Sequence, residues 1–277
     1  AVTCTVQATI LTGKSPREHG IVANGWLHPT GEVRFWQQDF RLLQAPSFTE
    51  GLNAVSLFWW FPMAAPLRGY ATPRPHYGAD GSKKFGILDM TGCGLEKALG
   101  PFPFSSFWGP MAGLPSSQWI ARSACHVMRT RGPQLTMVYL PHLDYDYQRY
   151  GPGNPRIMKE VDDCVGEILV AAKETGTEVI ALSEYGLTAV SQPVYLNRVL
   201  RKNGHLRVRQ SPFGEQFITD VEGAFAICDH QVAHIHCRGV DKHKVRETLL
   251  TEPGVAAVVE PRELALDHPR SGTWIAL

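Results

Sequence analysis

Two short apolar runs flank a long amphipathic pattern between residues 135 and 182. The runs LTMVYL and TEVIAL are continuous and bulky, which favours buried strands. Between them, apolar positions from Ile157 to Ala172 recur at helical spacing, after a cap at Asn154 and before Gly176. A strand, a helix and a strand in this order predict a parallel strand pair with a right-handed crossover. The sequence therefore predicts an α/β fold.

Further elements follow from the same periodicities. Residues 62–115 are rich in Pro, Gly and aromatic side chains, so we expect a loop-rich segment. Its aromatic side chains either line a substrate pocket or pack on the core. The remaining patterns predict strands at 53–61 and 254–260 and helices at 116–131, 194–202 and 241–250.

Polar side chains follow both strands of the predicted parallel pair. His142, Asp144 and Asp146 come after the first strand, and in an extended segment they point the same way. Glu184 follows the second strand, and the parallel arrangement brings it to the same sheet edge as Asp144. Asp and His ligands suit Zn²⁺, Mn²⁺ or Fe. The alternative is an ordinary polar loop.

The first residues of the chain suggest a second site. Thr3 precedes a mostly apolar run that ends at Gly13, which predicts a short helix. The start of a helix offers unpaired N–H groups and the positive end of its dipole, which together hold oxyanions. Thr3, Thr5, Thr9 and Cys4 all compete as the nucleophile at such a site. The alternative is an ordinary capped helix.

This stretch resembles the nucleophile segment of the alkaline phosphatase superfamily. It is most similar to the type I phosphodiesterase/nucleotide pyrophosphatase branch, whose pattern is T-F-P-N-x-x-x-x-x-T-G-x-x-P-x-x-H-G-I-x-x-N. The resemblance implies that Thr3 is the nucleophile, that it forms a covalent phospho-enzyme, and that Asn24 donates to the phosphoryl oxygens. The chain departs from the pattern where CTV replaces F-P-N. The matching positions are Thr3, Thr12, Gly13, Pro16, His19, Gly20, Ile21 and Asn24.

The resemblance continues at the two strand ends, with altered ligands. The branch has P-D-x-x-G-H-x-x-G-P where this chain has Asp144 and, at the histidine position, Gln148. The superfamily has S-D-H-G where this chain has Glu184 and Tyr185. The resemblance therefore implies divalent metals (Zn, Mn or Fe) held by Asp144, Glu184, Gln148 and Tyr185, with His142 as a further candidate from the spacing.

The resemblance also implies the architecture and the reaction. We expect an alkaline-phosphatase-like three-layer α/β/α sandwich with a mostly parallel sheet, formed by residues 1–189, and a small α+β cap-like insert over residues 190–277. We expect a fragment, whose first strand and last metal-binding histidine lie outside the sequence. The implied reaction is metal-dependent hydrolysis of phosphodiester or pyrophosphate bonds in a small phosphorylated substrate.

Two alternatives remain open for the function. One is a sulfate-ester or phosphonate hydrolase of the same fold. Thr3 and Gln7 replace the sulfatase Cys and Arg, which argues against sulfate esters. The other is a catalytically impaired pseudo-enzyme that binds a phosphorylated ligand.

Charge and cysteine usage bear on partners and location. The formal net charge is +1, which gives no electrostatic case for nucleic acid or an anionic membrane. No apolar run approaches the 18 residues of a membrane span. The six cysteines show no CxxC pairing, so we expect free thiols and a cytoplasmic protein.

Three histidines lie close together near the end of the chain. On one strand, His230, His234 and His236 would share a face. They would then form either a metal site or the polar face of a half-buried sheet.

Overall fold

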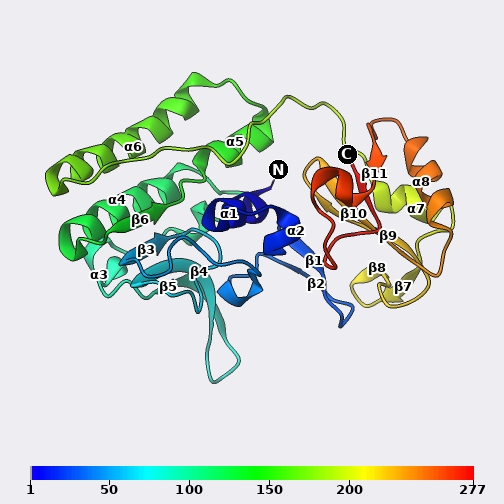
Figure 1. Cartoon of the computed structure of the whole chain (residues 1–277), viewed down its shortest axis with the longest axis horizontal. Helices are drawn as coiled ribbons and strands as arrows, with labels where there is room; N and C mark the ends of the chain where they lie inside the picture. Colours follow the sequence, from blue (N-terminus) through cyan, green and yellow to red (C-terminus); the bar gives the residue numbers. More distant parts are fainter. Residues whose placement is uncertain (1) are drawn as a thin grey trace. The chain divides into compact units, whose positions relative to one another are not determined.

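A computed structural model of the chain describes residues 2–277 (Figure 1). The chain forms two compact units. The first unit holds the chain up to Gln37, Leu42–Ser47 and Ser191–Leu277, and the second holds Gln38–Arg41 and Phe48–Val190. The assignment of residues 1–189 to a core and 190–277 to an insert stays a prediction.

The second unit is built on a four-stranded sheet of order β5-β4-β3-β6. β3 is parallel to both β4 and β6, whereas β5 returns antiparallel to β4. This mixed, mostly parallel sheet with helices confirms the predicted α/β class. The strands are β3 (Ala54–Leu57), β4 (Gly69–Tyr77), β5 (Lys83–Asp89) and β6 (Leu135–Val138).

Helix α4 (Leu114–Arg131) covers this sheet, and α6 (Pro155–Thr175) packs against α4 (Figure 1). α4 buries Trp119 and Ile120 against an aromatic cluster that includes Phe58 and Phe102. Both helices confirm the sequence predictions. They were predictable because interactions between residues close in sequence determine where they end. Asn154 accepts a hydrogen bond from the first turn of α6, and left-handed glycines end both helices. The unit also contains α3 (Leu95–Leu99), α5 (His142–Tyr150) and η2 (Phe104–Ser106).

The predicted strand at residues 177–182 is wrong. These residues form no helix and no strand, and Ile180 is 88 % exposed. β6 is therefore an edge strand, and the strand–helix–strand unit lacks its second strand. An apolar run becomes a strand only where it finds a neighbour to pair with, and residues 177–182 find none. The predicted strand at 53–61 is also shorter, because Phe58 and Phe61 adopt positive φ after β3 ends.

The first unit is built on an antiparallel sheet of order β11-β12-β10-β9. Its core joins Leu200 and Leu249 of the covering helices α7 and α8 to Ile235 and Trp274 of the sheet. The helices are α1 (Thr3–Thr12), α2 (Pro16–His19), α7 (Leu196–Lys202), α8 (Lys242–Leu250) and η3 (Pro261–Leu264). η1 (Phe40–Leu42) has residues in both units. The strands are β1 (Gly25–Leu27), β2 (Val33–Phe35), β7 (Val208–Ser211), β8 (Gly214–Phe217), β9 (Gly223–Asp229), β10 (Val232–Arg238), β11 (Val258–Val259) and β12 (Trp274–Ala276).

The three clustered histidines do not share a strand. β9 and β10 form a hairpin, and His230 occupies its two-residue turn with φ of 57°. His234 accepts a hydrogen bond from Gly272 N at its Nδ1, and His236 stacks on Phe225. The polar-face alternative is therefore closer to the observed structure. Within residues 2–277, no group of three or more His, Cys, Asp or Glu side chains is arranged to hold a metal.

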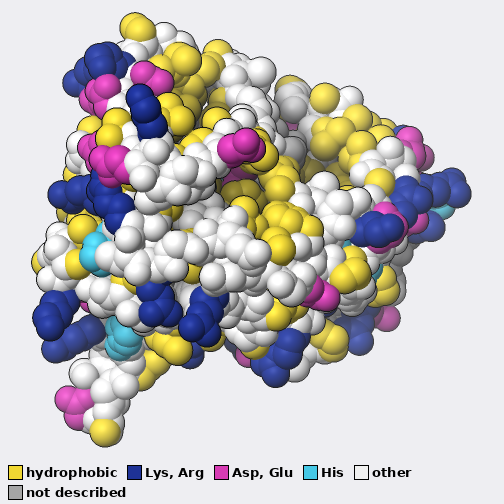
Figure 2. Space-filling model, turned by 60° about the vertical axis from the view of Figure 1, so that its left-hand side comes forward, with side chains coloured by type: hydrophobic (Ala, Val, Ile, Leu, Met, Phe, Trp, Pro, Cys, Tyr) yellow, Lys and Arg dark blue, Asp and Glu magenta, His cyan; other side chains and the backbone are white. Residues whose placement is uncertain are grey.

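The surface carries both signs of charge. In the view of Figure 2, Lys and Arg side chains lie in several separate places with acidic side chains among them. No helix within the described residues has the length and apolar composition needed to cross a bilayer.

Candidate functional site

Thr3 is the first residue of α1, as its proposed role requires. Val2 precedes it in extended conformation, and Thr3 is buried. The next amide, Cys4 N, donates to Asn24 Oδ1 at 2.8 Å. Asn24, 21 positions after Thr3, thus caps the first turn of the helix that carries the threonine. The structure brings these two predicted site residues together at the positive end of the α1 dipole.

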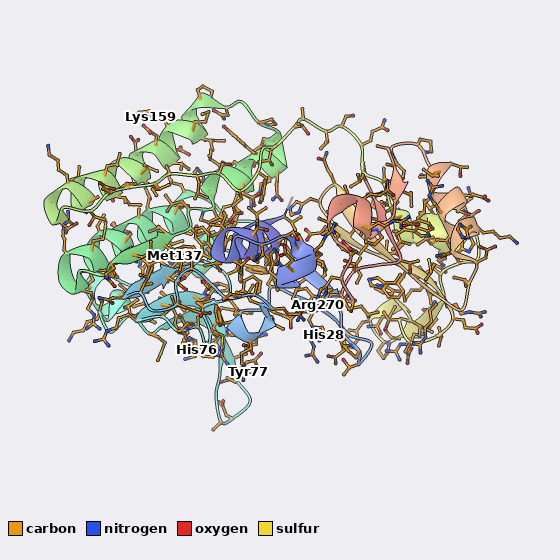
Figure 3. All side chains as sticks on the ribbon, in the orientation of Figure 1. His28, His76, Tyr77, Met137, Lys159 and Arg270 are labelled. Atoms are coloured by element: carbon orange, nitrogen blue, oxygen red, sulfur yellow. The ribbon has the colours of Figure 1, made fainter. Side chains whose placement is uncertain are left out.

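The turn between α1 and Asn24 explains the spacing of the N-terminal pattern. Gly13 and Gly20 both adopt positive φ, and each ends a helix. A Cβ on Gly20 would also lie 3.1 Å from Arg270 Nη1. Arg270, labelled in Figure 3, donates to Gly20 O at 2.7 Å. These residues fix the path that returns the chain to the start of α1.

His19 ties this turn to the side of α1. Its Nδ1 accepts from Ile21 N at 3.1 Å, and its Nε2 lies 3.0 Å from Thr9 Oγ1. Burial lowers the pKa of His19 to about 4, so the ring is neutral near pH 7. Because Nδ1 is the acceptor, Nε2 carries the proton and donates to Thr9.

The competing nucleophiles differ in their surroundings. Thr9 Oγ1 accepts a hydrogen bond from His19 and donates one to Thr5 O, so the hydroxyl already makes two structural hydrogen bonds. Thr5 Oγ1 is buried and has no hydrogen-bond partner in the described chain. Cys4 is buried, with 1 % of the residue exposed. Thr3 is the one of these four residues that starts the helix.

Asp229, which the sequence analysis did not single out, holds Asn24 in place. Its carboxylate accepts from Asn24 N at 3.0 Å and from Asn24 Nδ2 at 3.1 Å. It also accepts from His230 Nδ1 at 2.7 Å. Asp229 is buried, and three donors satisfy its charge. It fixes the orientation of the Asn24 amide, so that Oδ1 faces Cys4 N and one N–H of Nδ2 is left over.

A second group of predicted site residues lies in the second unit. Residues 142–150 form α5, not the extended segment that was expected. In this helix Asp144 and Gln148 are one turn apart, and Gln148 Nε2 donates to Asp144 Oδ1 at 2.7 Å. The Tyr185 hydroxyl donates to the same oxygen at 2.8 Å. Asp144, Gln148 and Tyr185 are thus brought together.

His142 does not join this group, so the expectation that it points with Asp144 is wrong. Two positions apart on a helix, the two side chains leave in different directions. The buried His142 ring places Nε2 2.7 Å from Glu160 Oε2 of α6, and its backbone N donates to Ser117 Oγ. His142 links three helices.

The carboxylates of Asp144 and Glu184 lie near Tyr139, which directly follows β6. Burial raises its pKa well above the usual range, and the nearby charges of Glu184 and Asp144 raise it further. The group around Tyr139 therefore offers carboxylate, phenol and amide oxygens. Such a set of oxygen ligands favours Mn²⁺ or Fe, whereas zinc sites are typically rich in nitrogen and sulfur ligands.

Comparison with known proteins decides the family. The family model for type I phosphodiesterase/nucleotide pyrophosphatase matches residues 1–270. The chain belongs to this family. It is accordingly a hydrolase, and the family acts on phosphoester bonds. No curated protein sequence matches the chain.

Solved structures share the fold of this family member. Phosphonoacetate hydrolase from Sinorhizobium meliloti 1021, in complex with phosphonoacetate, matches with a TM-score of 0.62 at 16% identity, over 98% of this chain and 68% of that one. Murine ectonucleotide pyrophosphatase/phosphodiesterase 5 matches with a TM-score of 0.56 at 14% identity, over 99% and 66%. The chain thus spans about two thirds of these proteins. They confirm the alkaline-phosphatase-like fold.

Sequence reasoning missed Asp229 and Glu160 in this family member. Asp229 is 205 positions from Asn24, so no local pattern relates the two. The sequence offered one signal for Asp229. The polar residues Asp229-His230-Gln231 interrupt an apolar alternation and therefore predict a turn. Glu160 lies on the polar side of the α6 pattern, where a solvated carboxylate was the natural expectation.

Acidification should destabilise the first unit of this family member. Burial lowers the pKa of each of His19, His234 and His236 to about 4, whereas the unfolded chain takes up these protons near pH 6.5. The stabilisation is therefore complete above pH 6.5 and is lost as the pH falls toward 4. Between pH 7 and pH 5 we expect a loss of about 2 kcal/mol per histidine.

Urea unfolding at pH 7 and pH 5 measures this loss. His234→Gln, which keeps an acceptor for Gly272 N, should reduce the difference between the two pH values. Equal stability at pH 7 and pH 5, or an unchanged difference in the variant, would contradict the assignment.

Proposed function

We propose that this protein hydrolyses phosphodiester or pyrophosphate bonds of a small phosphorylated substrate through a covalent phospho-threonine at Thr3. The observation that carries the proposal is the arrangement at the start of α1. There Thr3 occupies the first helical position, and Asn24 both caps the helix and keeps one amide N–H for a ligand. A structure of murine ectonucleotide pyrophosphatase/phosphodiesterase 5 described as an inactive threonine-to-alanine variant in complex with AMP supports a threonine nucleophile.

The chain's own groups have distinct roles in this proposal. Thr3 Oγ1 loses its proton to solvent and bonds to phosphorus while the bond to the leaving oxygen breaks. Water later cleaves the Oγ1–phosphorus bond, its hydroxyl going to phosphorus and its proton to Thr3. The α1 dipole and the remaining Asn24 N–H stabilise negative charge on the phosphoryl oxygens. Asp229 keeps the Asn24 amide oriented for this task.

We further propose a divalent metal, with Mn²⁺ or Fe ahead of Zn²⁺. Asp144 and Glu184 are the proposed ligands, with Gln148 and Tyr185 as neutral oxygen donors. His142 is left out because Glu160 occupies its Nε2. Such a metal would supply positive charge and would lower the pKa of an attached water.

Metal content tests the proposed ligands without relying on activity. Asp144→Asn should lower bound Mn²⁺, titrated by electron paramagnetic resonance on the full-length protein, by about tenfold or more. Asp146→Asn is the matched control, since Asp146 pairs with Arg149 on the same helix. Equal Mn²⁺ binding by both variants would remove Asp144 from the ligand set.

Hydrolysis assays on the full-length protein test the proposed function. After chelation and addition of Mn²⁺ or Zn²⁺, bis(p-nitrophenyl) phosphate should be turned over. Phosphonoacetate should be assayed beside it, because phosphonoacetate hydrolase shares the fold and makes phosphonates the second candidate substrates. No turnover of either substrate with any metal would favour the pseudo-enzyme alternative. We also propose a cytoplasmic location, supported by the six cysteines, which form no disulfide among the described residues.

A further inference from the structure

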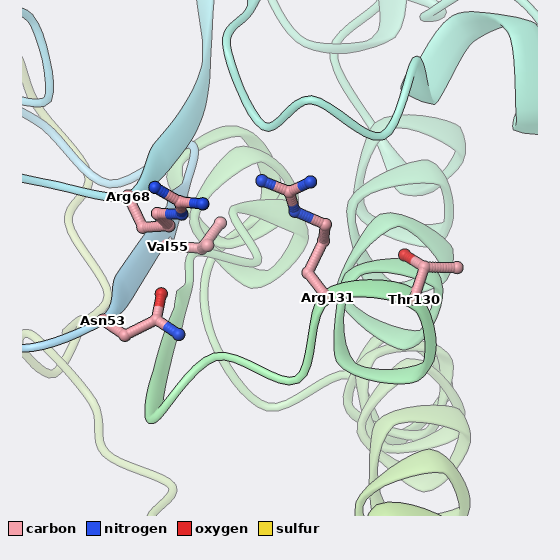
Figure 4. Close-up of a pocket in the computed structure, with 5 residues that line it drawn as sticks. All are labelled: Asn53, Val55, Arg68, Thr130 and Arg131. Carbon is pink, nitrogen blue, oxygen red and sulfur yellow. The ribbon is translucent and has the colours of Figure 1, made fainter.

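A pocket of about 250 Å³ opens at the amino edge of the sheet in the second unit (Figure 4). Asn53 directly precedes β3, Arg68 directly precedes β4, and Thr130 and Arg131 end α4 before β6. Asp144 follows the opposite, carboxyl end of β6. The two places are separated by at least the length of this four-residue strand, about 13 Å. The pocket is therefore distinct from the proposed metal ligands.

Two positive charges in this pocket lack partners. Among residues 2–277, neither the Arg68 nor the Arg131 guanidinium makes a hydrogen bond or an ion pair, and no acidic residue lines the pocket. Figure 4 shows the two guanidinium groups facing each other across the hollow. The neighbouring Arg129 behaves differently, since its Nε lies 2.7 Å from Glu174 Oε2.

The surroundings leave the two guanidinium groups accessible to a ligand. Gly92 lies beside Arg131, and a Cβ there would lie 3.4 Å from Arg131 Nη2, which is an ordinary contact distance. The Asn53 side chain has no hydrogen-bond partner in the described chain, so its amide is a third donor. Thr130 instead donates its proton to His126 O, and the buried Val55 supplies an apolar wall.

We propose that this pocket binds a phosphate dianion, either inorganic phosphate or the phosphate of a small monoester. Guanidinium forks match the oxygens of a tetrahedral oxyanion, and two of them balance its two charges. Water occupies about 30 Å³ per molecule, so the 250 Å³ pocket holds a phosphate group with space for a small attached group. The assignment is independent of the proposed hydrolase activity.

Arginine modification tests the site residue by residue. The full-length protein is treated with phenylglyoxal, and the modification rate of each arginine is read by peptide mass spectrometry. Inorganic phosphate and AMP, in separate arms, distinguish the free anion from a monoester. We expect at least one of the two ligands to slow modification of Arg68 and Arg131 by about fivefold, and the arm that protects them identifies the ligand. Arg122, an exposed arginine of α4 about 13 Å along the helix from Arg131, should be unaffected.

Variants provide a second measurement. Arg68→Gln should remove protection at Arg131, and Arg131→Gln should remove it at Arg68, because the two groups share one ligand. Both side chains are exposed, so the variants should keep the wild-type thermal unfolding temperature. Equal slowing at Arg122 or no slowing by either ligand would overturn the proposal. Protection of the remaining arginine in each of the two single variants would overturn it as well. The readout does not depend on catalysis, so it fails or holds separately from the proposed function.

Discussion

Replacing Thr3 with alanine should lower turnover of bis(p-nitrophenyl) phosphate by at least about 10³-fold. The substitution removes the only protein oxygen that the proposed mechanism bonds to phosphorus, and it leaves the helix start and the bond from Cys4 N to Asn24 in place. Stability should change little. Steady-state kinetics of the metal-loaded, full-length protein measures the effect.

Three control variants isolate the Thr3 hydroxyl. Thr3→Ser keeps a nucleophile and should retain activity within about tenfold of the wild type. Thr5→Ala and Cys4→Ser alter the competing nucleophiles of the same turn, and each should stay within about threefold. A Thr3→Ala protein as active as the wild type, or a loss that follows Cys4→Ser, would move the nucleophile elsewhere.

Replacing Asp229 with alanine should produce the second large effect. The change leaves the Asn24 amide, Asn24 N and His230 Nδ1 without their acceptor. We expect a loss of about 1–3 kcal/mol in stability, mainly from the two donors of the buried Asn24. We also expect kcat to fall by about 10²-fold with KM nearly unchanged, since a misoriented Asn24 no longer stabilises the transition state.

A double-mutant cycle separates positioning from general destabilisation. If Asp229 acts through Asn24, then Asp229→Ala should cost little further activity in an Asn24→Ala background. Asp267→Ala is the matched control, because this acidic residue of the same unit makes an exposed pair with Arg17. Additive losses in kcat would show that Asp229 does not work through Asn24.

Local signals predicted those parts of the fold that local interactions determine. The capped start of α6 at Asn154 and the glycine ends of α4 and α6 are set within a few residues, and both helices appear where expected. The pattern from Thr3 to Asn24 also forms one local unit of two helices, α1 and α2. Its glycines and His19 determine the path of the chain between Thr3 and Asn24.

Elements that depend on distant partners were not predictable. The run at 177–182 has the composition of a core strand, but pairing decides whether such a run becomes a strand. Residues 142–150 were expected to be extended, yet Asp144 and Gln148 meet across one turn of a helix. The contact between Asp229 and Asn24 joins a hairpin turn to a segment 205 positions earlier. No periodicity in the sequence encodes such a pair.

The covalent intermediate is the most direct measurement of Thr3 as the nucleophile. The full-length, metal-loaded protein is mixed with bis(p-nitrophenyl) phosphate, quenched in acid within the first turnover, and digested for tandem mass spectrometry. Attack by Thr3 releases one nitrophenol and leaves a nitrophenyl phosphoryl group on the threonine. We predict this adduct on Thr3 in the wild type and its absence in Thr3→Ala. An active enzyme that carries the adduct on another residue, or passes through turnover with no adduct, would contradict the role of Thr3.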